Sequence, residues 1–470
     1  MGPILIALLA SVMQTAGPPP AVIQRALELD VRLDYDEGTV AGTARLTIEN
    51  LGTARLDTIP LLLGRLMAVS GVRSGGGDPV PFSQDVVTFT DWPRFQVNYV
   101  RVVPHTALGP GARTVLGVSY AGTLVGYAET GMRYVRDRVD RDFTILRTDA
   151  LAFPRLGVPS VAAWRAMPRG DFEFGARITV PPDLVVAAAV PETERVPAGD
   201  DVTWVFAGRE PVPFLNITIA PYRVLQSGAL RIFHFADDGD GARTVLAGIE
   251  HAIDLYTTWF GPRGRAPALT VMEIPEGWGS QSSLAGGIIQ TADAFRDPRA
   301  MPQVFHEIAH LWHPVDTDAP PVRWNEGLAT FLQWRVAAAL DSAVPLDQAM
   351  AHTAQRLLQR LSSETRSVPM IAYGSAGLTD LSYLTGAVMF YLAYETLGPE
   401  RFDAVLGAYY RAHPHTGTST RAFADWLTGA EPGLRGTILE DWLFTTRGIG
   451  RLEAAEPLSA MVESYREAVR

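Results

Sequence analysis

The clearest chemical signature in the chain is the segment 304–313, which reads VFHEIAHLWH. His306 and His310 are four residues apart, and on a helix this spacing places two imidazoles on one face, where they can bind one zinc ion at about 2.0–2.1 Å. Glu307 lies beside them and can take a proton from a water molecule whose pKa the metal lowers towards ~7. The pattern therefore predicts a zinc site with Glu307 as the general base.

The other interpretation of this segment is an ordinary buried helix with two core histidines. The chain has nine histidines, and so few make a chance match to this pattern rare. It has no cysteine, which excludes disulfides, thiolate catalysis and cysteine-ligated zinc. Any bound metal must therefore be held by histidine and carboxylate side chains.

A third ligand is needed, and two carboxylates are candidates. Glu326 lies in WNEGLATFLQW, whose apolar residues indicate a second helix, and the turn-like VDTDAPPV before it can bring that helix back antiparallel. Asp316, six residues after His310, would require a tight turn with glycine at the position of His313. We therefore favour Glu326 over Asp316, and expect His313 near the ligands or on the surface.

A tyrosine in a third apolar segment is a candidate oxyanion donor. The segment 380–398 reads DLSYLTGAVMFYLAYETLG, with Asp380 as the predicted N-cap and Gly398 after the last helical residue. Tyr383 would lie in the first turn, where its phenol can donate a hydrogen bond to the oxyanion that forms when water attacks a carbonyl. The alternative is a tyrosine of the core or of an interface.

The segments that must position these residues follow two patterns. From about residue 22 to 222, short stretches alternate apolar and polar residues around turns, which is typical of an antiparallel β-sandwich or open barrel. From about residue 225 helical periodicity dominates, and in 242–260 it places Val245, Ile249 and Tyr256 on one face. We predict an α+β fold of two domains: a β-rich domain at 22–225, a mostly helical domain at 226–450 and a helical tail at 451–470.

Composition and charge restrict the partners. The 470 residues, 47% hydrophobic and 19% charged, indicate a globular protein of more than one domain. The net charge of −11 argues against nucleic acid or an anionic membrane as the partner. The acidic stretch 237–241 lacks the bidentate glutamate of a calcium loop, so we predict a surface turn there.

The N-terminus carries an apolar run at 4–13. Ten residues are too short to cross a bilayer but fit the apolar stretch of an export signal. We therefore predict an export signal at 1–21 and a secreted or periplasmic protein that is soluble after signal removal. The alternative is a frayed or packed N-terminal segment. No later run is long and apolar enough for a membrane helix.

Together these motifs resemble the aminopeptidase N family of zinc metallopeptidases, which are gluzincins. HEIAHLW resembles the family's zinc helix, WNEGLATF its third-ligand helix and YLTGAVMFYLAYETLG the segment with its catalytic tyrosine. The resemblance covers roughly residues 24–445 and implies a β-rich domain followed by a thermolysin-like catalytic domain, without the family's long C-terminal helical domain. It also implies that His306, His310 and Glu326 bind one zinc ion, with Glu307 as base and Tyr383 stabilising the oxyanion.

Besides the missing C-terminal helical domain, the resemblance breaks at two places. Only 15 residues separate His310 from Glu326, which is fewer than the family usually has and indicates a tighter connecting loop. The family's substrate-binding strand, Gly-x-Met-Glu-Asn, has as its counterpart Gly277, Trp278, Gly279, Ser280 and Gln281. Ser280 replaces the glutamate that anchors a free amino group, and a neutral side chain cannot hold an ammonium group as a carboxylate does. Glu276 is the nearest substitute.

These observations favour a zinc-dependent peptide hydrolase, with a metalloaminopeptidase as the default specificity. The first alternative is an endopeptidase-like relative, because Ser280 removes the amine anchor and the missing C-terminal domain leaves the cleft open. A second is a catalytically weak, zinc-stabilised peptide-binding protein, which intact Glu307 and Tyr383 argue against. A third is a hydrolase that uses the same zinc site on a non-peptide substrate.

Overall fold

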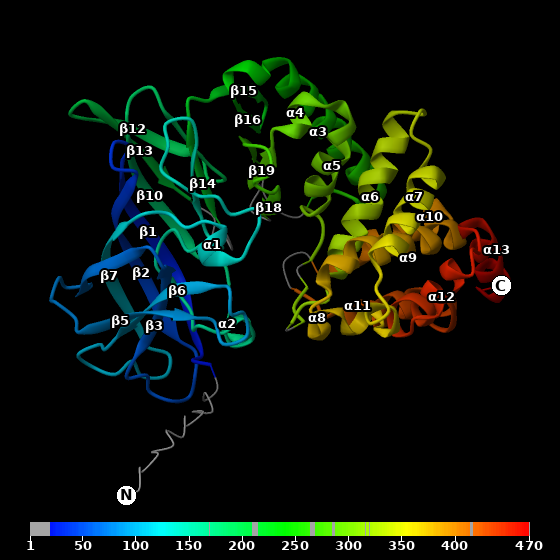
Figure 1. Cartoon of the computed structure of the whole chain (residues 1–470), viewed down its shortest axis with the longest axis horizontal. Coiled ribbons are helices and arrows are strands. Elements are labelled where there is room, and N and C mark those ends of the chain that lie inside the picture. Colours follow the sequence, from blue (N-terminus) through cyan, green and yellow to red (C-terminus); the bar gives the residue numbers. More distant parts are fainter. Residues whose placement is uncertain are drawn as a thin grey trace, which may run out of the picture.

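The computed structural model describes residues 19–168, 170–208, 215–263, 268–283, 287–314, 316–318, 320–413 and 417–469. A β-rich part and a helical part lie side by side, with a small mixed sheet at the top between them (Figure 1). This arrangement confirms the predicted α+β fold of two domains. Residues 1–18, which hold the apolar run of the predicted export signal, lie outside the described residues.

The N-terminal part is built on a seven-stranded sheet of order β12-β13-β10-β1-β2-β7-β4. Its strands are β1 (Val22–Asp34), β2 (Thr39–Asn50), β4 (Met67–Ser74), β7 (Arg113–Gly122), β10 (Glu173–Val180), β12 (Glu192–Ala198) and β13 (Asp201–Ala207). β1 and β2 form a hairpin, and Gly38 takes the positive φ of 67° that its turn requires. Alternate residues of β1, including Leu27, Leu29 and Val31, are buried on one face.

Two smaller sheets complete this part. One contains β3 (Ile59–Gly64), β5 (Phe82–Thr88), β6 (Gln96–Val102) and β9 (Arg155–Leu156), and the other contains β8 (Thr144–Arg147), β11 (Val185–Ala188) and β14 (Asn216–Ala220). Buried side chains of all three sheets share one core, which favours the sandwich over the barrel. In the described residues the large sheet stays open, with β12 and β4 as its edges. The short helices are α1 (Tyr127–Thr130) and α2 (Val161–Ala166).

One strand pair departs from the antiparallel prediction. β1 and β10 are parallel neighbours, with Leu27 opposite Phe174 and Val31 opposite Ile178. A parallel pair needs a long connection that returns the chain to the starting edge, and here strands β2 to β9 supply it. Only the local alternation was visible in the sequence, so the pairing of distant strands could not be assigned.

A mixed five-stranded sheet begins the second part, with strand order β15-β16-β17-β19-β18. Its strands are β15 (Arg223–Ser227), β16 (Leu230–His234), β17 (Leu269–Ile274), β18 (Gln281–Ser283) and β19 (Gly287–Thr291). Helix α3 (Gly239–Phe260) crosses over between the parallel strands β16 and β17. As predicted, Val245, Ile249 and Tyr256 of α3 are buried.

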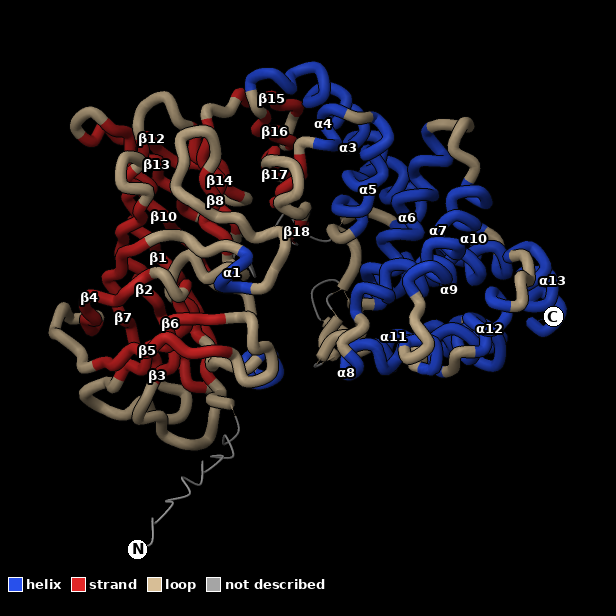
Figure 2. Tube along the Cα trace, viewed as in Figure 1, coloured by secondary structure: helices blue, strands red, loops and turns tan. Residues whose placement is uncertain are grey.

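Helices form the remainder of the second part (Figure 2). They are α4 (Asp293–Arg296), α5 (Met301–Ala309), α6 (Trp324–Leu340), α7 (Leu346–Arg360), α8 (Tyr373–Ala376), α9 (Ser382–Leu397), α10 (Pro399–Ala412), α11 (Thr420–Ala430), α12 (Arg447–Glu453) and α13 (Leu458–Val469). A π-helical segment covers Arg435–Phe444, and short 3₁₀ turns lie at Ala236–Asp238, Pro298–Ala300, Thr365–Ser367, Met370–Ala372, Thr379–Leu381 and Pro432–Leu434. None of the helices in the described ranges is long and apolar enough to cross a membrane.

Helix α9 begins differently from the prediction. It starts at Ser382, so Tyr383 lies in its first turn as expected, and Gly398 follows its last residue with a φ of 81°. Asp380, however, is not its N-cap but lies within the preceding 3₁₀ turn. The i→i+3 hydrogen bonds of that turn satisfy the first amide groups of the helix, so no capping side chain is required.

Helices α6 and α9 approach each other through two glycines. A Cβ atom added to Gly327 would lie 2.5 Å from the Cα atom of Gly386, which leaves no room for a side chain at the crossing. Because Gly327 follows Glu326 and Gly386 lies one turn after Tyr383, the crossing holds these two candidate site residues close together.

A buried carboxyl pair lies where β17 meets the start of α3. Glu273 is completely buried and accepts the amide proton of Phe235, and the carboxyl group of Asp238 lies close enough to affect its pKa. Asp238 in turn binds Arg296 through both of its carboxylate oxygens. The prediction of a surface turn at 237–241 is therefore wrong for Asp238, which is 8% exposed. Its pairing with Arg296, 58 residues away, was invisible to local sequence reading.

Because Glu273 is buried beside Asp238, we expect the free energy of unfolding to fall as the pH rises. Burial, aided by Asp238, raises the pKa of Glu273 from an ordinary 4.5 to about 8. The folded protein therefore holds a proton that the unfolded chain releases, and stability is lost between these two pH values. We expect Glu273→Gln, which keeps the shape, to flatten the melting temperature between pH 5 and 9, measured by differential scanning calorimetry. The exposed Glu37→Gln serves as the control, and a wild-type curve no steeper than that of Glu273→Gln would contradict the assignment.

Candidate metal centre and catalytic site

Helix α5 carries the predicted metal-binding motif and is fixed from behind by α3. The Tyr256 hydroxyl of α3 donates to the Phe305 carbonyl at 3.0 Å, and Gly248 leaves room for Met301 and Phe305 to pack closely. The helix ends at Ala309, so His310 is its C-cap but keeps helical backbone angles. Both histidines therefore point from one face of a buried helix, as the spacing predicted.

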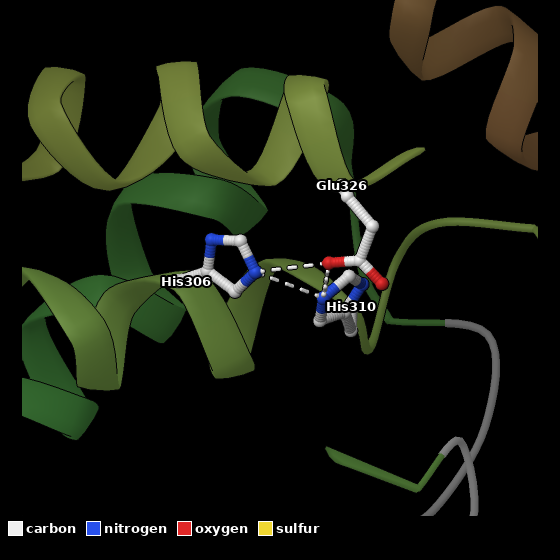
Figure 3. A group of neighbouring side chains, drawn as sticks. All are labelled: His306, His310 and Glu326. Carbon is white, nitrogen blue, oxygen red and sulfur yellow. Dashed lines mark hydrogen bonds and ion pairs between the residues drawn. The ribbon is translucent and has the colours of Figure 1, made fainter. Parts of the chain in front are cut away.

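Three side chains converge on one point (Figure 3). Nε2 of His306 lies 3.2 Å from Nε2 of His310 and 3.2 Å from Oε2 of Glu326, and the distance from His310 Nε2 to Glu326 Oε2 is 3.3 Å. Two imidazole nitrogens and a carboxylate oxygen aimed at each other are stable only with a cation between them or a proton shared among them. This donor set is one that zinc accepts, with a fourth position left open for reactants.

The pKa values of the two glutamates are shifted in opposite directions, downwards for Glu326 and upwards for Glu307. Burial opposes ionisation of Glu326, but His310 and His306 hold its pKa well below the ordinary value. Burial raises the pKa of Glu307 to about 7, with Glu326 adding to the rise. Glu326 is thus ionised, as a carboxylate that could bind a metal must be, whereas Glu307 is poised to take up and release a proton near neutral pH.

Gln333 is a site residue that the sequence reading missed. Its Oε1 lies 3.0 Å from Nδ1 of His306. An amide oxygen can only accept, so it fixes the proton on Nδ1 and leaves Nε2 of His306 free to bind a cation. Gln333 is seven residues after Glu326 on α6, and two helical turns put both on one face. That spacing was the available signal.

Tyr383 lies directly beside the three ligands. Its ring stacks on His306 with centroids 5.9 Å apart and planes 9° from parallel. Burial, together with the charge of Glu326, raises the pKa of Tyr383 well above its ordinary value, so the phenol remains protonated. It can therefore act as a hydrogen-bond donor at the site.

The structure brings Glu326 rather than Asp316 to the two histidines. Asp316 accepts the amide protons of Asp318 at 2.9 Å and Arg323 at 2.6 Å, so its carboxylate holds the loop before α6. His313 is buried between His310 and Tyr410, and its ring nitrogens have no hydrogen-bond partner among the described residues. Burial, with the neighbouring histidines, holds its pKa well below the ordinary value, which keeps His313 neutral.

The predicted substrate-binding residues do not form a strand over their whole length. Gly277 and Gly279 have positive φ values of 77° and 71°, so the chain loops there, and only Gln281 belongs to β18. Trp278 is buried, and its carbonyl accepts a hydrogen bond from Arg147 of the N-terminal part. The remaining contacts link the Ser280 hydroxyl to the amide of Thr291 and the Gln281 side chain to Asn216. Glu276, the substitute anchor, is exposed.

The fold and the site together define a class: a two-domain, thermolysin-like arrangement whose helices present a His–His–Glu group with a glutamate and a tyrosine beside it. No family model matches the sequence. A search of curated proteins finds no match either.

Solved structures do match. The M1 zinc metallopeptidase from Deinococcus radiodurans is 20% identical, with a TM-score of 0.68 over 91% of this chain and 95% of that one. A mutant of that protein bound to the substrate Tyr-Ser-Ala gives 20% identity and a TM-score of 0.67, over 90% of this chain and 94% of that one. A two-domain M1 mutant bound to L-arginine gives 19% and 0.63, over 95% and 94%. The chain therefore has the fold of the two-domain M1 zinc metallopeptidases, as the resemblance implied.

The contact between Gln333 and His306 predicts a loss of metal affinity on mutation. Gln333→Leu keeps the size of the side chain but removes the acceptor that orients the imidazole, and loss of such a partner typically weakens metal binding about 10–100-fold. The zinc dissociation constant, measured by competition with a chelator, should rise by this factor. The exposed Gln355→Leu on α7 is the control. Equal affinities for the two variants would show that Gln333 does not orient His306.

Proposed function

We propose that the chain is a zinc-dependent peptide hydrolase, with aminopeptidase activity as its first specificity. The observation that carries this proposal is the convergence of His306, His310 and Glu326, with Glu307 and Tyr383 beside them. The M1 fold supports it, and the similar solved structures include proteins bound to a tripeptide substrate and to amino acids.

Each residue has a role in peptide hydrolysis. His306, His310 and Glu326 would hold zinc, which when bound polarises a carbonyl and lowers the pKa of water. Glu307 takes a proton from the attacking water and passes it to the leaving amine, a task suited to a carboxylate whose pKa lies near 7. Tyr383, which stays protonated, donates a hydrogen bond to the developing oxyanion. Gln333 keeps His306 in the tautomer that this arrangement needs.

The proposal extends to the organisation of the chain. We place the domain limits at 22–225 and 226–450 with a tail at 451–470. The first limit falls within β15, the first strand of the mixed sheet, and that position supports a change of domain near residue 225. We also propose export, which rests on the apolar run at 4–13. The five residues Gly277, Trp278, Gly279, Ser280 and Gln281 remain proposed substrate contacts, since their loop joins the two parts of the chain.

Glu307→Gln should abolish hydrolysis while leaving zinc bound. Loss of a general base typically costs about 10²–10⁴-fold in rate, and the amide keeps the shape of the site. We would measure it by mass spectrometry on a peptide pool with free and N-acetylated members, using zinc-loaded protein and the exposed Glu364→Gln as control. Stepwise loss from free N-termini alone supports an aminopeptidase. Cuts in acetylated peptides favour the endopeptidase-like alternative, and no Glu307-dependent cleavage favours a binding protein.

Tyr383→Phe should lower kcat by about 10²–10³-fold with little change in KM, because the phenol is expected to act on the transition state rather than on the bound peptide. Steady-state kinetics on a cleaved peptide from the same pool would show this. The matched control is Tyr391→Phe, two turns further along α9. A kcat equal to that of the control would remove Tyr383 from the mechanism.

A further inference from the structure

Arg323, immediately before α6, has an unusual backbone conformation that the mechanism above does not explain. Its φ of 65° and ψ of 41° are left-handed, and among the described non-glycine residues only Leu151 and Ala455 also have a positive φ. A side chain in this region strains the backbone, and such residues concentrate at functional sites.

Three neighbours impose this conformation. The Asp316 carboxylate accepts the amide proton of Arg323 at 2.6 Å, and the Arg323 carbonyl accepts the amide proton of Glu326 at 3.2 Å. One residue earlier, the Val322 carbonyl accepts the hydroxyl proton of Ser382 from α9. The same hydrogen bonds that place the ligand Glu326 therefore also place Arg323.

The guanidinium of Arg323 has no partner of its own. It forms no ion pair or hydrogen bond with any residue in the described part of the chain, although it is largely removed from solvent. The buried arginines Arg147 and Arg335, by contrast, are paired with Asp137 and Asp403. Burial alone would lower the pKa of Arg323, but nearby groups, Tyr383 and Glu326 among them, raise it above its ordinary value. Because none of these groups contacts the guanidinium directly within the described part of the chain, its N–H groups are available to an anion that arrives with a ligand.

The surroundings of Arg323 show where that anion would lie. Its charge interacts with Tyr383, Glu326 and Asp380 of the catalytic part and with Tyr134 of the N-terminal part. Tyr134 itself donates to Asp149 at 2.9 Å and does not neutralise the guanidinium. These charge interactions place Arg323 near Tyr383 and Glu326, where the two parts of the chain meet.

We propose that Arg323 binds the α-carboxylate of a short peptide substrate, so that di- and tripeptides are preferred over longer chains. This rests on the proposed peptidase function. The guanidinium presents paired N–H groups that match the two oxygens of a carboxylate. An extended residue spans only about 3.3–3.6 Å, so an anion next to Tyr383 belongs within a residue or two of the reacting carbonyl. In a di- or tripeptide that anion is the C-terminal carboxylate, whereas a longer neutral chain would leave the guanidinium of Arg323 without a direct hydrogen-bonding partner.

The test compares Tyr-Ser-Ala with its C-terminal amide, both with free N-termini. A charge-assisted hydrogen bond typically changes affinity by about 10–100-fold, so wild-type kcat/KM should favour the acid over the amide by that factor. In Arg323→Met, which keeps an apolar stem, the ratio should fall to near one while the rate on the amide is retained. Arg323→Lys should give an intermediate ratio, and the exposed Arg133→Gln should keep the wild-type ratio. Zinc content and melting temperature report on folding.

Each other outcome overturns the proposal. A wild-type ratio near one, or a ratio preserved in Arg323→Met, would mean that Arg323 does not bind the carboxylate, although the peptidase function would stand. An equal loss on acid and amide would assign Arg323 to the oxyanion or to the fold. If the wild type cleaves neither peptide, the proposed peptidase function fails, and calorimetric binding of acid and amide to Glu307→Gln decides on Arg323 separately.

Discussion

The close crossing of α6 and α9 is the constraint on which the site depends. Gly327 and Gly386 let the two backbones meet with no side chain between them, and a Cβ atom on either glycine would come within 3.0 Å of the opposite backbone. Glu326 precedes the first glycine, and Tyr383 lies one turn before the second. A wider crossing would separate the Glu326 carboxylate from the Tyr383 phenol, even with every site residue unchanged.

The neighbouring contacts extend this constraint to the whole site. Gln333, on the ligand's own helix α6, fixes the tautomer of His306, and α3 fixes α5 through the hydrogen bond of Tyr256 to Phe305. The converging atoms of His306, His310 and Glu326 repel one another unless a positive charge lies among them, so a metal bound there would couple its binding to the folding of this part. The mostly apolar helices around the site strengthen that coupling, because they exclude the water that would otherwise solvate the ligands.

The sequence was informative where the chemistry is local. His306 and His310 lie four residues apart, and Tyr383 could be placed in the first turn of α9 from the pattern of one helix. Glu326 could be predicted because the apolar residues around it indicate a second helix. In contrast, the left-handed backbone of Arg323 depends on Asp316, and the raised pKa of Glu273 depends on its burial and on Asp238. Such contacts join residues from different segments, so they cannot be predicted from the local periodicity of the sequence. The parallel pairing of β1 with β10 could not be predicted for the same reason.

The connection of 15 residues between His310 and Glu326 is held by side-chain hydrogen bonds at both ends and in the middle. Trp312 donates from its ring nitrogen to the Gly261 carbonyl at 3.0 Å, which holds the start of the loop on the end of α3. Asp318 accepts the amide proton of Thr420 at 2.9 Å and thereby ties the middle of the loop to α11. Asp316 closes the end through Arg323. With both ends and the middle held, fewer residues suffice to bring Glu326 back to the histidines, and the last loop residue before α6 can be kept in a strained conformation beside the site.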